Sequence, residues 1–384
     1  MKNQILIIAF AFLIISCKNS NDNKAETSST NLKELEVKID SLFNSKIGIN
    51  EPGAAVLISY DQKMIIGKGY GLRDLETKTP ITINTNMRMG SVSKQFTALC
   101  VLSLVDDGLF SLNDSITKFW DYPVFKDITV KQLINHTSGI ADYYDNFDKN
   151  WDKNRIVVNQ DILEWLATHP RPIFKPGTKW KYSNTGYIVL ALLAEKVSGE
   201  EFASYAKKNV FDKANMQETN YYSLANPIEI KERAFCYEKD SLNMWVKADG
   251  NYMNGMLGDG AVYTSIKDFH AYNNALQEQS IVSKKMHELV FRPSSMAIND
   301  TYGLNFLNNA EEKYGAGWFL TKDFALHSGS WIGARTIVIK ELDRPLTIAI
   351  FLNSSSSDTR KILIEETYKF ADEYIKTAAN NGYK

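Results

Sequence analysis

A serine and a lysine stand three positions apart in residues 89–98, which read MGSVSKQFTA. On a helix, residues i and i+3 lie on one face with their Cβ atoms about 5–6 Å apart, so the Lys94 amine is within reach of the Ser91 hydroxyl. A lysine among apolar side chains loses part of the solvation of its charged form, its pKa falls, and it can act as a base. The pair therefore has the chemistry of an activated serine nucleophile.

The S-x-x-K spacing alone is not selective, because it recurs at Ser115/Lys118 and Ser204/Lys207. What distinguishes Ser91 is the segment that follows it, which is apolar on nearly every side when drawn as a helix up to Gly108. A helix that is apolar all round is buried, and a glycine commonly ends one. Ser91 would then lie at a helix N-terminus, where free N–H groups favour a developing negative charge. The other two pairs lie in polar surroundings typical of a solvated surface.

The elements that must hold this helix come from both ends of the chain. Two apolar runs at 54–59 and 64–70 predict an antiparallel hairpin, and runs at 324–327, 336–339 and 346–352 predict further strands before a closing helix. Residues between them are mostly helix-like. This order predicts an α/β part over about 32–119 and 255–384, with an inserted all-helical lobe over about 120–254.

Within the predicted lobe, residues 129–132 (TVKQ) form a capping-box pattern that opens a short helix. The loop after it contains His136, which we expect to stabilise the loop rather than take part in chemistry. The aromatic and acidic stretch 143–147 is compatible either with loop packing or with the wall of a cleft.

The first residues predict an exported protein. Lys2 precedes an apolar run at 5–15 that is too short to span a membrane and has the length of a signal-peptide core. The run ends in Ile14-Ile15-Ser16-Cys17, which resembles a bacterial lipobox. We therefore expect residues 1–16 to be a signal peptide and Cys17 to be lipidated, followed by a flexible tether over 17–31. This would make the protein a membrane-anchored lipoprotein of the periplasm or cell surface; the alternative is an ordinary cleaved signal.

Composition narrows the function classes. The formal net charge of −1 gives no indication of a nucleic-acid partner. The five histidines are scattered and no H-E-x-x-H occurs, so neither a metal site nor a cofactor is predicted. Besides Cys17, only Cys100 and Cys236 remain, either as free thiols or as one disulfide. The oligomeric state stays open.

Two further motifs follow the serine and lysine along the chain. Tyr182-Ser183-Asn184 is one of four Y-x-N matches, and His327-Ser328-Gly329 comes near the end. In this order, S-x-x-K, Y-x-N and H-x-G resemble the serine β-lactamase and penicillin-binding protein superfamily, in particular its class C β-lactamase-like branch. The sequence around each motif is also similar to the family's, over roughly residues 32–375. The similar flanking segments are 90–98, 133–139 (LINHTSG), Pro176-Gly177, Gly258-Asp259-Gly260 and 314–318 (YGAGW).

The resemblance implies a β-lactamase/transpeptidase-like fold, in which an antiparallel sheet is flanked by helices and carries a helical lobe. It implies that Ser91 forms an acyl-enzyme, that Lys94 shares or takes its proton, and that Tyr182 passes a proton to the leaving group and activates the deacylating water. The N–H groups of Ser91 and Ser330 would hold the oxyanion. The implied substrate-binding residues are Asn184, His327, Ser328, Gly329 and Ser330.

The third motif departs from the lactamase form of the family. Most β-lactamases of this branch have a lysine where this chain has His327, and histidine is only partly charged near neutrality. The resemblance is closer to D,D-carboxypeptidase- and esterase-like members. We therefore expect hydrolysis of an amide or ester, with a D-amino-acid peptide as the leading substrate. The alternatives are a class C-type β-lactamase and a catalytically silent lipoprotein that binds penicillin or cell-wall peptides.

Overall fold

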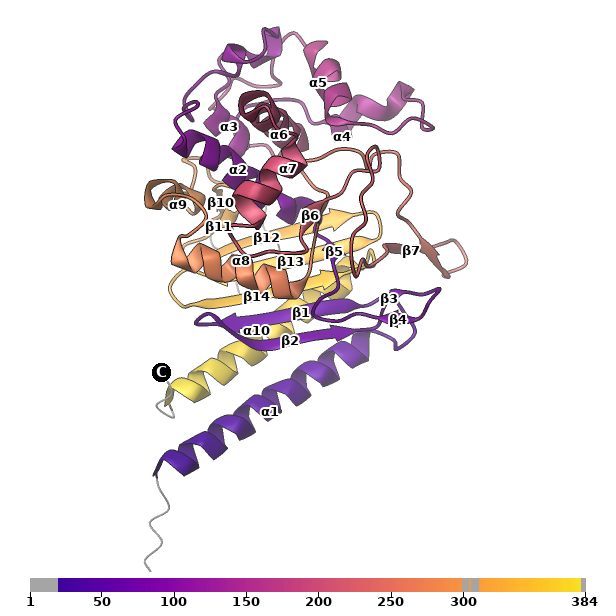
Figure 1. Ribbon diagram of the computed structural model, residues 1–384, viewed down its shortest axis with the longest axis vertical. Coiled ribbons are helices and arrows are strands. Elements are labelled where there is room, and N and C mark those ends of the chain that lie inside the picture. Colours follow the sequence, from indigo (N-terminus) through magenta and orange to yellow (C-terminus); the bar gives the residue numbers. More distant parts are fainter. Residues whose placement is uncertain (1–19, 299–303, 305–310, 381–384) are drawn as a thin grey trace, which may run out of the picture.

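A computed structural model describes residues 20–298, 304 and 311–380. Its central element is a seven-stranded antiparallel sheet with the order β10-β11-β12-β13-β14-β1-β2 (Figure 1). The N-terminal hairpin joins the C-terminal strands where β1 pairs with β14, with Val56 opposite Ile350. Both ends of the chain therefore build one sheet, as the sequence predicts. The strands are β1 Ala54–Tyr60, β2 Lys63–Tyr70, β10 Lys313–Tyr314, β11 Phe319–Leu320, β12 Phe324–Trp331, β13 Ala334–Glu341 and β14 Leu346–Leu352.

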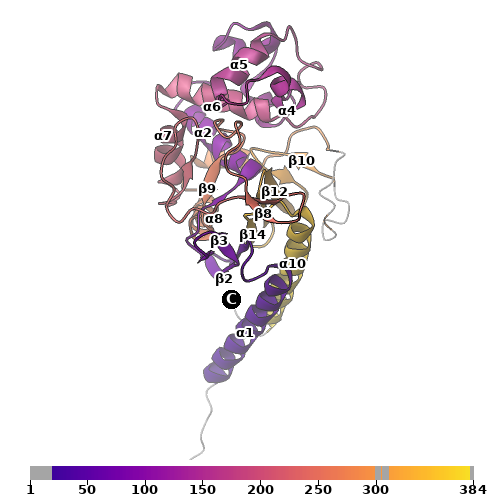
Figure 2. The same ribbon diagram turned by 90° about the vertical axis from the view of Figure 1, so that its right-hand side faces the viewer.

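Helices cover both faces of this sheet. The first helix, α1 (Ser20–Lys46), packs along the last helix, α10 (Ser357–Asn380), and α10 contacts β13 and β14. On the other face, α8 (Ile266–Glu278) contacts β1 and β2 (Figures 1 and 2). The largely apolar strands β1 and β14 are buried on both sides as a result, which is why they read as nearly continuous hydrophobic runs.

The buried helix predicted after Ser91 is present. A 3₁₀ turn over Gly90–Ser93 leads into α2 (Lys94–Asp106), and the residues from Lys94 to Leu104 are all buried. Beyond its last turn the chain adopts a left-handed conformation at Gly108, with φ of +75°. Burial on every side explains the absence of an amphipathic pattern. This helix passes between the sheet and the helical region and contacts both α6 and α9.

The helical region lies at one end of the molecule, above the sheet in Figure 1. The predicted capping box is confirmed: Thr129 and Gln132 satisfy each other's backbone N–H groups at the start of α3. The helices outside the α1, α2, α8 and α10 group are α3 Val130–Ile134, α4 Tyr143–Asn146, α5 Asn159–Ala167, α6 Asn184–Ser198, α7 Phe202–Ala206 and α9 Lys284–Val290.

The prediction of an all-helical lobe over 120–254 is wrong, because short strands occupy the last third of this region. One of them pairs with β9, which in turn pairs with the strand that precedes Ser91. Strands this short carry too few residues to show a period of two in the sequence. The short strands are β3 Leu72–Asp74, β4 Thr79–Pro80, β5 Met87–Arg88, β6 Asn220–Tyr221, β7 Tyr237–Lys239, β8 Trp245–Lys247 and β9 Val262–Thr264.

The N-terminal segment differs from the flexible tether predicted over 17–31, because α1 already begins at Ser20. Residues 20–31 are polar but contain neither glycine nor proline, so the helix continues through them without a breaker. Residues 1–16 and Cys17 lie outside the described residues, and the signal peptide and the lipidation of Cys17 stay predictions. Within the described part of the chain, no helix combines the length and apolar character needed to cross a membrane.

The sequence left open whether Cys100 and Cys236 form a disulfide. In the structure both are buried free thiols. Cys100 lies inside α2, and Cys236 directly precedes β7. Burial raises the pKa of both thiols, so each behaves as a small apolar side chain rather than as a nucleophile.

Candidate active site

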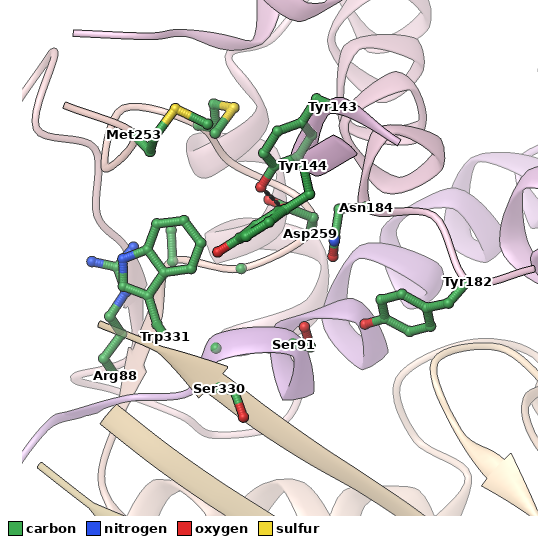
Figure 3. Close-up of a pocket in the computed structure, with 14 residues that line it drawn as sticks. Arg88, Ser91, Tyr143, Tyr144, Tyr182, Asn184, Met253, Asp259, Ser330 and Trp331 are labelled. Atoms are coloured by element: carbon green, nitrogen blue, oxygen red, sulfur yellow. Dashed lines mark hydrogen bonds between the residues drawn. The ribbon is translucent and has the colours of Figure 1, made fainter. Parts of the chain in front are cut away.

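A pocket of about 270 Å³ opens where the start of α2, the end of β12 and the helical region meet (Figure 3). It contains four of the residues predicted from the motifs, namely Ser91, Tyr182, Asn184 and Ser330. The remaining lining residues are Arg88, Gly90, Tyr143, Tyr144, Met253, Met256, Asp259, Gly260, Ala261 and Trp331.

The serine and lysine of the first motif are in hydrogen-bonding contact. The Lys94 Nζ lies 3.1 Å from the Ser91 Oγ, because the 3₁₀ turn and the first turn of α2 place both side chains on one face. The same amine donates to Asn184 Oδ1 at 2.8 Å and to the backbone oxygen of Asp259 at 2.7 Å. Three acceptors from three separate segments therefore hold the lysine against the serine.

The electrostatics of Lys94 favour its use as a base. The residue is fully buried, and burial lowers its pKa to about 8, while the nearby charges of Asp259 and Asp142 act in the opposite direction. An amine with this pKa is neutral in a sizeable fraction of molecules near pH 7 to 8. Neutral Lys94 is able to accept the Ser91 proton, as general-base activation of a serine requires.

Tyr182 stands on the other side of this pair. Its ring lies over the amine, with Lys94 Nζ 4.9 Å from the ring centroid, and its hydroxyl is directed toward Ser91 (Figure 3). His136 holds the second motif, residues 182–184, in place. Its Nδ1 accepts the Ser183 N–H at 3.2 Å, and its ring packs on that of Tyr182 with centroids 4.3 Å apart. His136 therefore supports the second motif, in line with the loop-stabilising role predicted for it.

The backbone of the third motif approaches the first motif very closely. A Cβ placed on Gly329 would lie 1.9 Å from Met89 O, and one placed on Gly90 would lie 2.8 Å from Ser330 N. Only glycine fits at both positions, and Gly90 also has a φ of +52°. This contact brings Ser91 and Ser330 to one wall of the pocket, where their N–H groups are the predicted donors to an oxyanion.

His327 does not line the pocket, contrary to the substrate-binding role that the resemblance implies for it. Its side chain is 1% exposed, and neither His327, Ser328 nor Gly329 is among the lining residues. The His327 Nδ1 lies 2.7 Å from Ser328 O, so this nitrogen carries the proton, and Nε2 accepts from the Tyr314 hydroxyl at 3.0 Å. Burial, with a further contribution from Lys94, lowers the pKa of His327 to about 3. The expectation of partial charge near neutrality is therefore wrong.

Two acidic residues that the motifs do not include shape the site. Asp142 Oδ2 accepts both the backbone N–H and the side-chain amide of Asn184, at 2.7 and 3.2 Å, and so orients the amide that binds Lys94. Asp259 Oδ2 accepts the Tyr143 hydroxyl at 2.7 Å. Asp142 is also the N-cap of α4. An aspartate before the aromatic stretch 143–147 was the available sequence signal. Both alternatives for that stretch apply, because Tyr143 and Tyr144 line the pocket while Tyr143 and Phe147 pack in a buried apolar cluster.

Protonation of the two buried histidines should weaken the fold in mild acid. Burial lowers the pKa of His327 to about 3 and that of His136 well below its usual value, whereas an unfolded histidine has a pKa of about 6.5. The stability due to these neutral histidines is thus complete above about pH 6.5 and is lost as the pH falls toward the folded-state values. Two protons give a slope of up to about 2.7 kcal/mol per pH unit.

Urea unfolding between about pH 6.5 and 5, where carboxylates titrate little, measures this slope. His270 and His287, whose pKa burial also lowers, add to the slope. His327→Gln should therefore reduce it by up to about 1.4 kcal/mol per pH unit, whatever its effect on absolute stability. An unchanged slope in the variant would show that His327 is already protonated in the folded protein.

Among the residues that the structure describes, no group of histidine, cysteine, aspartate or glutamate side chains is arranged to hold a metal ion. The site is built from a serine, an amine, a phenol, an amide and backbone N–H groups. These are the parts of an acyl-transfer site that works through a covalent serine intermediate.

The fold and this site are those of a serine hydrolase. The profile of the beta-lactamase family matches residues 40–369, and the chain belongs to that family. The assignment agrees with the order of the three motifs and with the sheet built from both chain ends.

Individual relatives agree with the family. The chain is 31% identical over 337 residues to penicillin-binding protein 4* of Bacillus subtilis, covering 84% of this chain and 72% of that protein. The octameric penicillin-binding protein homologue from Pyrococcus abyssi has the same fold, with a TM-score of 0.75 and 26% identity over 89% of this chain and 77% of that one. The D-amino acid amidase from Ochrobactrum anthropi SV3, complexed with L-phenylalanine amide, superposes with a TM-score of 0.70 at 20% identity, covering 90% and 99%.

Proposed function

We propose that the protein hydrolyses an amide or ester through an acyl-enzyme on Ser91, and that a D-amino-acid peptide is its leading substrate class. The observation that carries the proposal is the 3.1 Å contact between Ser91 Oγ and a buried Lys94 amine inside the pocket. A surface lysine would remain charged and could not accept the serine proton at neutral pH.

The reaction has two halves in this arrangement. Ser91 Oγ loses its proton to neutral Lys94 and attacks the carbonyl carbon, while the N–H groups of Ser91 and Ser330 hold the oxyanion. The Tyr182 hydroxyl then gives a proton to the leaving nitrogen or oxygen as its bond to the carbonyl carbon breaks, and recovers a proton from Lys94. In the second half, the Tyr182 oxygen takes a proton from water after giving its own proton to Lys94, and the resulting hydroxide attacks the ester carbon. As the bond from this carbon to Ser91 Oγ breaks, Lys94 returns a proton to Ser91 Oγ and the acid leaves.

The choice of substrate rests on charge and on the relatives. The third-motif histidine is buried and hydrogen-bonded on both nitrogens, so it supplies no cation for the carboxylate of a lactam antibiotic. This favours the peptidase- and esterase-like activity over efficient β-lactam turnover. A relative named as a penicillin-binding protein and a fold neighbour named as a D-amino acid amidase support the same ranking.

The substrate class is tested by comparing kcat/KM for three substrates: a peptide ending in D-Ala-D-Ala, a short-chain nitrophenyl ester and a chromogenic cephalosporin. The L-Ala-L-Ala peptide is the stereochemical control. We expect turnover of the D-peptide or the ester to exceed that of the cephalosporin. A strong preference for the cephalosporin would make the protein a class C-type β-lactamase, and absence of turnover with all three would favour the silent binding protein.

A further inference from the structure

Arg88 is a buried cation without an anionic partner in the active-site pocket. It is the last residue of β5 and lies three positions before Ser91, and it is 6% exposed. Its guanidinium forms neither an ion pair nor a hydrogen bond with any described residue, and its Nε is buried without a partner. The nearby Arg233 shows the usual arrangement, since it pairs with Asp249 at 2.7 Å.

Aromatic rings hold the guanidinium in place. Its central carbon lies 5.2 Å from the centroid of the Trp331 ring and 5.9 Å from that of Tyr263. Such contacts offset only part of the cost of taking a cation out of water. A buried guanidinium that still borders a pocket therefore retains hydrogen-bonding capacity that no described residue uses.

Charges of both signs act on Tyr144, which also lines the pocket. Burial, followed by the charges of Asp259 and Asp142, raises its pKa to about 12, while Arg88 and Arg335 act in the lowering direction. The two carboxylates have partners of their own, since Asp259 accepts from Tyr143 and Asp142 accepts from Asn184. Arg88 is the charged group of this pocket that has no such partner among the described residues.

The position of Arg88 relative to the reacting atoms selects one part of the substrate. In Figure 3, Tyr182 lies on one side of Ser91, and Arg88, Trp331 and Met253 lie on the opposite side. Tyr182 serves the leaving group in the proposed mechanism. The end of the pocket that contains Arg88 is therefore left for the acyl part of the substrate.

We propose that Arg88 binds a carboxylate carried by the acyl part of the substrate, so that the enzyme selects acyl groups with an anionic substituent. This inference rests on the proposed function, because the mechanism proposed there places the leaving group beside Tyr182 and so the acyl part beside Arg88. A planar guanidinium binds a carboxylate through two parallel hydrogen bonds, and the substrate would supply the counter-charge that the protein lacks. Arg88 is thus a specificity-determining residue.

The test uses matched nitrophenyl esters that differ only in charge. For adipate, pimelate and suberate, the half-ester with a free terminal carboxylate is compared with its neutral methyl ester. The leaving group is identical, and three chain lengths sample the span from Ser91 to the guanidinium. We expect kcat/KM for the anionic ester to exceed that for the neutral one at least about tenfold at the best length, as a charged hydrogen bond provides.

Variants then assign the preference. Arg88→Met keeps an apolar stem beside Trp331 and should bring the anionic-to-neutral ratio to about one or below, whereas Arg88→Lys should keep part of the preference. Arg292→Met is the matched control, since it removes a guanidinium that is exposed and paired with Glu288. It should leave the ratio as in the wild type. Because each enzyme is compared with itself on two esters, a general loss of activity does not affect the readout.

A binding measurement separates this inference from the proposed function. Adipate monoamide is titrated calorimetrically into Ser91→Ala protein with and without Arg88→Met. Arg88-dependent binding would support the inference even if no ester were turned over, in which case only the proposed hydrolysis would fail. A wild-type ratio of one at every chain length, or a preference that survives Arg88→Met, would overturn the inference while hydrolysis through Ser91 stands.

Discussion

Ser91→Ala should lower kcat/KM for every substrate by at least roughly a thousandfold, because it removes the atom that forms the acyl-enzyme. The direct readout is intact mass after incubation with a fluorophosphonate or a fluorescent penicillin. The wild type should gain one adduct and the variant none. The oxyanion donors and the pocket walls are unchanged by the substitution, so the loss reports on the nucleophile itself.

The chain offers a matched control in Ser115, which has the same spacing to Lys118. In the structure the Ser115 hydroxyl accepts the Thr117 N–H, and Lys118 pairs with Asp114 at 2.8 Å, both in exposed positions. Ser115→Ala should therefore lose no acylation and only about 1 kcal/mol of stability through its lost cap. An adduct that survives Ser91→Ala, or disappears in Ser115→Ala, would contradict the assignment.

The second large effect concerns Lys94. If its neutral form is the base, kcat/KM should rise about tenfold per pH unit in mild acid and level off above about pH 8, where the buried amine is deprotonated. Lys94→Met, which keeps the length of the side chain without the amine, should abolish acylation and this pH dependence. Far-UV circular dichroism and a cooperative thermal transition check that the variant is folded. A variant that unfolds would mean that the amine is needed for the fold.

Asp142 provides an independent check on the same pH profile. Its charge raises the pKa of Lys94, so Asp142→Asn should move the midpoint of the profile to lower pH. A midpoint that does not move in this variant would show that the profile reports on a different group. Asp142 is a positioning residue, because it touches Asn184 rather than the reacting atoms.

Local patterns predicted much of the fold because the forces behind them are local. The strands β1 and β14 are mostly apolar, α2 is apolar on nearly every side, and the capping box of Thr129 and Gln132 involves a single helical turn. Ser91 could be chosen among three similar pairs because burial of its helix is itself visible in the sequence. The proposed nucleophile and its base lie only three positions apart, so their contact is also local.

What escaped prediction depends on contacts between distant segments. His327 is neutral because it is buried and close to Lys94, and its Nε2 accepts a hydrogen bond from Tyr314; no property of the triplet at 327–329 indicates that. Asp142, at the start of α4, contacts Asn184 at the start of α6, 42 positions further along the chain. Arg88 is unpaired because no carboxylate of a described residue is placed to form an ion pair with it. The helical start of α1 shows a different limit, since polar composition alone does not separate an exposed helix from a tether.

The pairing of β1 with β14 has a consequence for the order in which the molecule forms. Val56 finds its partner only when Ile350 has been synthesised, and β12, which carries Ser330, is connected to β1 through β13 and β14. The contacts that complete the oxyanion wall are therefore among the most distant along the chain, and such contacts are slow to form. A nascent chain that has emerged only as far as α9 already contains Ser91, Lys94 and Tyr182. It still lacks β12, the strand that carries Ser330. Hydrolytic activity thus arises late, when nearly the whole polypeptide is available to fold.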